Sequence, residues 1–160
     1  KMKTYGWGIL AGLEASHVVV FLARKKADLE FDSSYIRHIQ EEVKQLPAEI
    51  DAAYREKYAQ FTKEDYKTFE SERAAFDWAS KQTYIVMANM MTMAAYEGLD
   101  SCPLEGFNQD DMTALLGDEL GLFDTKHFGI AVMAAFGYRG EEPHRNKTRR
   151  TMDEIVKVVE

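Results

Sequence analysis

Tyr84-Ile-Val-Met-Ala-Asn-Met-Met-Thr-Met-Ala-Ala-Tyr96 is apolar on nearly every side when it is wound as an α-helix. The pattern predicts a helix over residues 77–97 that ends at Gly98, because glycine suits the left-handed conformation that closes many helices. An isolated surface helix would carry a polar face, which this one lacks. We therefore expect it either to lie at the centre of the domain or to line a subunit interface.

Two apolar runs outside this helix are typical of central β-strands. Ser16-His-Val-Val-Val-Phe-Leu-Ala23 and residues 128–138 are too continuously apolar for strands with one exposed face. Because two strands do not make a stable sheet, further strands have to come from a preceding segment, a partner subunit or short pieces that the pattern does not reveal. The sequence predicts one domain over residues 1–160 that mixes helices and strands.

Residues 31–76 form a polar excursion between the first strand and the long helix. A capping cluster at 32–34 opens a helix that ends at Pro47, and a second helix follows over 48–61. An apolar stripe is predicted on the first helix at Tyr35, Ile36, Ile39, Val43 and Leu46. The excursion also carries many rings, namely Tyr54, Tyr58, Phe61, Tyr66, Phe69 and Phe76. Two interpretations stay open: the rings pin the excursion to the domain, or the excursion is a lid whose rings face a substrate.

Composition excludes several classes of protein. With 20 basic and 27 acidic residues the net charge is −7, which disfavours binding to nucleic acid or to an anionic membrane surface. Apolar runs such as Val18 to Ala23 are far too short to cross a bilayer. A single cysteine, Cys102, cannot build a disulfide framework, so we expect a cytoplasmic protein.

Two segments are candidates for chemistry. The tail Pro143-His-Arg-Asn-Lys-Thr-Arg-Arg150 is basic in an acidic chain, and in an extended chain Arg145, Lys147 and Arg149 share one face. Such a face suits a phosphate monoester, although a short basic run is more often simply solvated. The turn Cys102-Pro-Leu-Glu-Gly106 offers backbone N–H groups to a ligand, or serves only as a turn.

No metal site is expected. Adjacent methionines of the long helix point in different directions, so they fit core packing better than metal ligation. His38 and Glu42 share a helix face but lack further ligands. Cys102 has no histidine near it in sequence and is expected to be a buried, inert thiol, which leaves the catalytic residues unknown.

Four segments together resemble the FMN-dependent NAD(P)H nitroreductase family: residues 13–21, 78–84, 98–107 and 146–149. They occur in the family's order and span nearly the whole chain. The resemblance implies an α+β fold with a mixed sheet flanked by helices. It also implies a homodimer with FMN at the interface, the long helix at the dimer axis and a C-terminal arm, residues 139–160, around the partner.

The resemblance also assigns cofactor-binding residues. The turn Pro103-Leu-Glu-Gly106 would lie beside the flavin, with the backbone amides of Glu105 and Gly106 near N5 and O4. Lys147 and Arg149 would hold the FMN phosphate. This agrees with the basic tail and turns our preference toward phosphate binding.

The activity implied is hydride transfer from NAD(P)H to FMN, followed by two-electron reduction of a nitroaromatic, quinone or flavin acceptor in ping-pong order. The alternative is a non-catalytic flavin-binding or helical interaction protein on the same scaffold. Family members begin with an Arg-x-Ser-x-Arg segment and place a lysine near the flavin pyrimidine. No such motif is found before Tyr5, so we expect the sequence to lack the family's N-terminal segment. Thr4 to Ala23 contains no Lys or Arg, and Gly8 and Ala11 occupy the positions where the lysine is expected.

Overall fold

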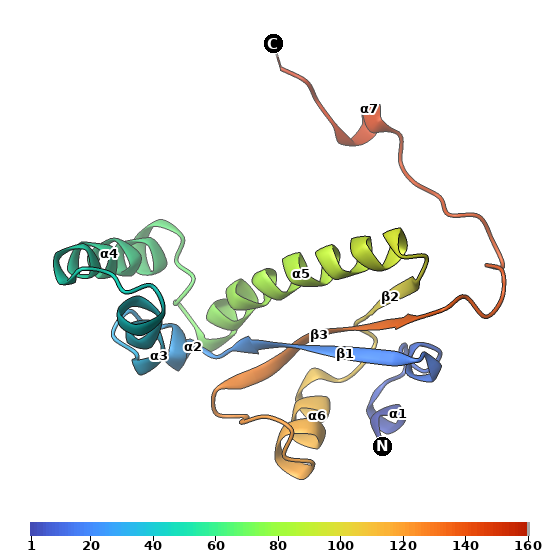
Figure 1. The fold of residues 1–160 in the computed structure, drawn as a ribbon, viewed down its shortest axis with the longest axis horizontal. Helices are drawn as coiled ribbons and strands as arrows, with labels where there is room; N and C mark the ends of the chain where they lie inside the picture. Colours follow the sequence, from blue (N-terminus) through green and yellow to red (C-terminus); the bar gives the residue numbers. More distant parts are fainter. Residues whose placement is uncertain (160) are drawn as a thin grey trace.

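Strand β3 (Phe128–Gly137) is the middle of a three-stranded sheet with the order β1-β3-β2 (Figure 1). The structure is a computed structural model that describes residues 1–159. Strands β1 (His17–Arg24) and β2 (Asp100–Leu104) both pair antiparallel to β3, so every pairing in the described chain is antiparallel. The α+β class expected from the sequence is confirmed.

Strand β1 is an edge strand in this sheet, so the prediction that it is central was wrong. Its side chains alternate between two cores: Phe21 joins the cluster beneath the long helix, and Val20 packs against the cluster on the opposite face. A continuous apolar run therefore indicates that both faces of the strand are buried, but it does not indicate how many strands pair with it. The residues of 128–138, by contrast, do form the central strand.

The sequence pattern of strand β2 does not predict a strand. Asp100-Ser-Cys-Pro-Leu104 contains an aspartate and a proline, both depleted in strands. The segment is extended because it pairs with the second half of β3, from Gly137 opposite Asp100 to Met133 opposite Leu104.

Helix α5 (Glu72–Tyr96) covers one face of the sheet (Figure 1). It begins five residues before the predicted start because the Ser71 side chain caps it by accepting a hydrogen bond from the Ala74 N–H, at 3.0 Å. The excursion therefore ends before Phe76, which lies inside α5. At the other end Gly98 has the left-handed φ of 76° that the sequence predicted.

The opposite face of the sheet is covered by the N-terminal segment and by α6 (Gln109–Thr113). A buried cluster on this side contains Ile9, Leu104, Met112, Leu115, Leu116, Ile130, Met133 and Ala135. The remaining short elements here are α1 (Met2–Tyr5), η1 (Gly12–Glu14) and the wider π-helical turn η4 (Ala114–Glu119).

After β1 the chain passes through α2 (Lys26–Leu29) into the excursion, which projects beyond one end of the sheet (Figure 1). It continues through α3 (Ser34–His38), η2 (Ile39–Val43), α4 (Ala48–Gln60) and η3 (Phe61–Asp65). The π-helical geometry of η2 changes which side chains face inward, because it holds more residues per turn than an α-helix. Gln40 is buried and Val43 is exposed, so the predicted apolar stripe fails at Val43.

The rings of the excursion divide into two groups. Tyr58 and Phe69 pack with Trp78 of α5 and join the excursion to the body of the domain. Tyr54 and Tyr66 keep much of their surface exposed. The packing role is visible for the first group, and the lid interpretation for residues 31–76 stays a prediction.

The chain after β3 leaves the body as an extended tail that carries one short helix, α7 (Met152–Ile155) (Figure 1). The tail residues are exposed. Among residues 1–159, no helix is both long enough and apolar enough to cross a membrane.

Candidate functional site

The turn at Glu105–Gly106 begins where strand β2 ends. Leu104 is the last residue of β2 and pairs with Met133, while β3 continues to Phe128 with no β2 partner beside it. The N–H and C=O groups of β3 that β2 leaves open need other partners. The Gln109 side chain supplies one, because its Nε2 donates to the Ile130 carbonyl oxygen at 2.6 Å.

A backbone contact with the N-terminal segment fixes the turn. The Gly8 N–H donates to the Gly106 carbonyl oxygen at 2.8 Å, and the Asn108 N–H donates to the Tyr5 carbonyl oxygen at 2.9 Å. A Cβ placed on Gly106 would lie 2.5 Å from the Gly8 Cα, which is a severe overlap. Gly106 is not among the residues with positive φ, so this close approach is what requires glycine there.

The direction of the N–H groups along β2 follows from Pro103. Proline has no N–H, so it fits a position whose N–H side faces away from the neighbouring strand. These directions alternate along an antiparallel strand, so the N–H of Glu105, two residues later, also faces away from β3. Apart from the ladder, no backbone acceptor is found within residues 1–159 for the N–H groups of Glu105 and Gly106.

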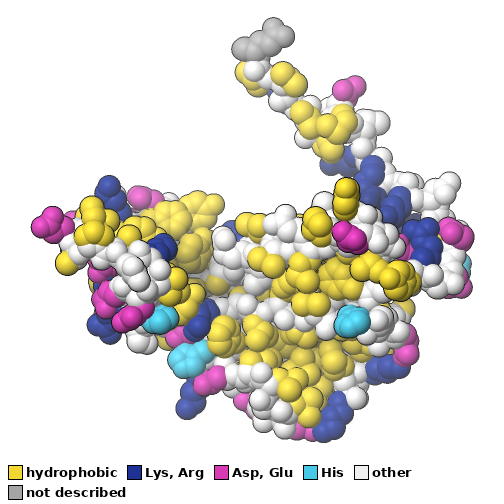
Figure 2. Space-filling view, in the orientation of Figure 1, with side chains coloured by type: hydrophobic (Ala, Val, Ile, Leu, Met, Phe, Trp, Pro, Cys, Tyr) yellow, Lys and Arg dark blue, Asp and Glu magenta, His cyan; other side chains and the backbone are white. Residues whose placement is uncertain are grey.

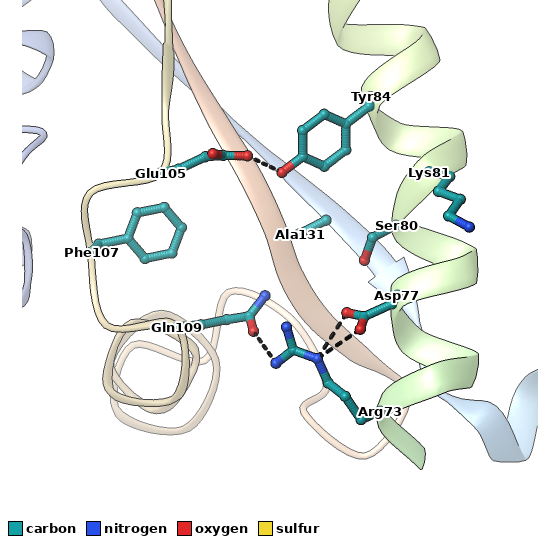
Figure 3. Close-up of a pocket in the computed structure, with 9 residues that line it drawn as sticks. All are labelled: Arg73, Asp77, Ser80, Lys81, Tyr84, Glu105, Phe107, Gln109 and Ala131. Atoms are coloured by element: carbon teal, nitrogen blue, oxygen red, sulfur yellow. Dashed lines mark hydrogen bonds and ion pairs between the residues drawn. The ribbon is translucent and has the colours of Figure 1, made fainter. Parts of the chain in front are cut away.

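The side chain of Glu105 points into a cavity of about 500 Å³ between the turn and α5 (Figure 3). Tyr84 on α5 donates a hydrogen bond from its hydroxyl to the Glu105 carboxylate. Burial, together with this bond to a carboxylate, raises the pKa of Tyr84 to about 12. At the far side of the cavity Arg73 forms an ion pair with Asp77 at 2.8 Å. Ser80, Lys81, Phe107, Gln109 and Ala131 complete the lining.

A second, larger hollow of about 1020 Å³ lies at the beginning of β2. Cys102 and Lys147 both line it, so the tail returns to the strand at this end. Arg139 binds Asp100 with Nε 2.9 Å from the carboxylate, and this hydrogen bond holds the pKa of Asp100 below its usual value. Lys147 acts on Asp100 in the same direction from a greater distance.

The predicted site residues fall into three environments. Pro103 and Glu105 are exposed and Gly106 is half-buried, whereas the Leu104 side chain is buried in the core, so only its backbone is free for a ligand. Lys147 lines the larger hollow. Arg149 lines neither cavity, and its guanidinium donates to the Thr148 carbonyl oxygen at 2.7 Å.

Cys102 is exposed within the single chain, so the expectation of a buried thiol was wrong. Cys102 itself borders the hollow at the outer strand of the sheet, where no element of the described chain covers it.

Sequence reasoning missed the residues that surround the turn. Gly8 shows no signal, because only the fold brings its backbone against Gly106. Tyr84 and Arg73 do have a sequence signal: together with Asp77, Ser80 and Lys81 they recur at helical spacing, which places them on one face of α5.

Comparisons with known proteins agree on one family. The model of the family described as "Nitroreductase family" matches residues 11–138. The Bacillus subtilis protein named "Putative NAD(P)H nitroreductase YfkO" is 46% identical over 160 residues, which are 99% of this chain and 72% of that protein. A Staphylococcus epidermidis protein with the same descriptive name is 45% identical over 161 residues, covering 100% of this chain and 71% of its own.

Solved structures agree in fold. A nitroreductase family protein from Streptococcus pneumoniae superposes with a TM-score of 0.65 at 13% identity, covering 98% of this chain and 72% of that one. A structure from Exiguobacterium sibiricum, described as a "putative nitroreductase in complex with FMN", gives a TM-score of 0.67 at 15% identity over 98% of this chain and 69% of that one.

The Gly8–Gly106 contact predicts an asymmetry between two glycines. Gly106→Ala should lower the free energy of unfolding by about 1–3 kcal/mol, because its Cβ meets backbone atoms that cannot rotate away. Gly140→Ala is the control, since nothing lies within 4 Å of a Cβ at that position. Urea denaturation of both variants measures the difference, and equal midpoints would show that the contact is not tight.

Proposed function

The chain belongs to the nitroreductase family, and on that premise we propose that it is an FMN-dependent NAD(P)H oxidoreductase that reduces nitroaromatic, quinone or flavin acceptors by electron pairs. The observation that supports this most directly is the Glu105–Gly106 turn, which lies beside a cavity and whose N–H groups have no backbone acceptor outside the ladder within residues 1–159. We also propose that it works as a homodimer in the cytoplasm.

The residues present fit FMN. Its planar ring needs hydrogen-bond donors at one end and its phosphate needs cations at the other. The turn after β2 offers such donors, and Lys147 lines, together with Cys102, the hollow near the start of the strand. At about 3.3 Å per residue, Cys102 and Glu105 are roughly 10 Å apart. One strand thus spans the two ends of a ligand of this kind.

Each group has a distinct task in this proposal. Bound FMN would supply the redox chemistry by accepting a hydride from NAD(P)H and passing it to the second substrate in ping-pong order. The amides of Glu105 and Gly106 would orient the reacting edge of the ring, and the Gly8 N–H binds the Gly106 carbonyl oxygen next to them. Lys147 and Arg149 would bind the phosphate through charge-assisted hydrogen bonds.

The outer face of α5 supports the homodimer. Ile85, Val86 and Met93 are more than half exposed, and Met90 is 38% exposed. A contiguous apolar face of this kind is typical of an interface. Figure 2 shows apolar side chains gathered over this part of the molecule and over the sheet.

The first prediction from this proposal concerns the reaction. The protein reconstituted with FMN should show flavin absorbance that bleaches when NADH or NADPH is added without oxygen, and a nitroaromatic or quinone should restore it. Parallel lines in double-reciprocal plots are expected, since the two substrates would use one site in turn. Flavin that stays bound but never bleaches would favour the non-catalytic alternative.

Lys147 offers a test of phosphate binding. Lys147→Ala should weaken FMN binding by about 1.5–3 kcal/mol, the range for a hydrogen bond between charged groups. Riboflavin lacks the phosphate, so its affinity should hardly change. Lys157→Ala, another exposed tail lysine, is the matched control. Fluorescence titration with both flavins gives the four affinities, and equal losses for FMN and riboflavin would remove Lys147 from the phosphate site.

The assembly is tested on α5. Met90→Asp should dissociate the homodimer or greatly weaken it, because a carboxylate without a partner is costly at an apolar interface. Leu122→Asp is the control, since Leu122 is 68% exposed and lies away from α5. Sedimentation velocity at micromolar concentration distinguishes them. A wild-type protein that sediments as a monomer would contradict the assembly.

A further inference from the structure

The Glu105 side chain has one fixed partner, and that partner is neutral. Within residues 1–159 its carboxylate accepts a side-chain hydrogen bond from the Tyr84 hydroxyl and forms no ion pair. The nearest guanidinium on the cavity wall, that of Arg73, is already paired with Asp77. Figure 3 shows Tyr84 reaching from α5 across the cavity to Glu105.

Tyr84 stands on a well-anchored part of α5. Met87, three residues later, is buried in the cluster against the sheet. Ser80, four residues earlier, is also buried, and its hydroxyl donates to the Phe76 carbonyl oxygen at 2.8 Å. Residues three and four apart share a helix face, so Tyr84 is held on the side of α5 that packs toward the sheet.

The turn itself has few restraints on the side that faces this cavity. Its backbone is fixed to Gly8 through Gly106, and Glu105 accepts the Phe107 N–H at 2.8 Å. After Leu104 the ladder with β3 stops, so Glu105 has no paired residue on β3 beside it. The bond from Tyr84 is the tie between Glu105 and the helix.

We propose that Tyr84 is a positioning residue: by holding the Glu105 carboxylate against α5, it sets the direction of the Glu105 and Gly106 N–H groups that would contact the flavin. The consequence for the flavin rests on the proposed function, whereas the bond between Tyr84 and Glu105 rests on the geometry of this chain alone. A second effect follows from charge. A carboxylate near a ring that accepts electrons opposes their arrival, and a hydroxyl that donates to it offsets part of that field.

The phenol is suited to this role over the whole physiological range. Its raised pKa of about 12 keeps the proton on Tyr84, so it remains a donor. A lysine at this place would instead add a positive charge beside the turn.

Two variants separate the effect of the Tyr84–Glu105 hydrogen bond from the effect of the Glu105 charge. Tyr84→Phe keeps the ring and removes the donor, whereas Glu105→Gln keeps an acceptor for Tyr84 and removes the charge. Tyr96→Phe, on the same helix and 85% exposed, is the control. In the flavin-free protein, hydrogen–deuterium exchange at the Glu105 and Gly106 amides should accelerate in Tyr84→Phe and stay unchanged in Glu105→Gln and Tyr96→Phe.

The FMN-bound protein allows a second set of measurements. FMN affinity should fall about tenfold in Tyr84→Phe, the size of one hydrogen bond to a charged group. Affinity for sulfite, which adds at flavin N5, should fall in Tyr84→Phe and rise in Glu105→Gln, where the opposing charge is gone. Unchanged amide exchange in Tyr84→Phe would overturn the tie whether or not the protein binds FMN. Failure of the wild type to bind FMN would overturn the proposed function and leave the exchange result standing.

Discussion

The backbone contact between Gly8 and Gly106 determines where the candidate site lies, because it joins the N-terminal segment to the point at which strand β2 leaves the sheet. With side chains at both positions the two segments could not approach so closely. The contact lies just after Leu104, where β2 ends, and the first half of β3 is left for Gln109 and the cavity beside it. Two small residues, far apart in the sequence, thereby give the turn a fixed place.

Strand β2 connects the two ends of the proposed cofactor site. At its C-terminal end are the Glu105–Gly106 turn and the Tyr84 hydroxyl, and at its N-terminal end is the hollow with Lys147. Helix α5 contributes on both sides. Its inner face packs on the sheet through Met87 and presents Tyr84 to the turn, while its outer face is the apolar surface to which we assign the partner subunit.

Much of the fold could be predicted from local pattern, and the errors have physical causes. The long helix and its end at Gly98 follow from hydrophobic pattern and from the left-handed glycine. Strand β1 was placed wrongly in the sheet because burial of both faces resembles burial between two strands. Strand β2 could not be predicted from the sequence, because its extended conformation comes from pairing with β3 and not from the propensities of its own residues. In the candidate site, the turn and the basic tail are predictions from residue type and from the family resemblance, whereas Gly8 and Tyr84 enter the site through contacts that only the folded chain creates.

The central claim is that the Glu105 and Gly106 amides are donors to the flavin ring, and amide NMR tests it most directly. The resonances of these two N–H groups should shift strongly and saturably when the protein is titrated with FMN, and also with riboflavin, because the ring is common to both. Lys147 and its neighbours should shift with FMN only. Shifts confined to the tail, with the Glu105 and Gly106 amides unmoved at saturation, would contradict the account.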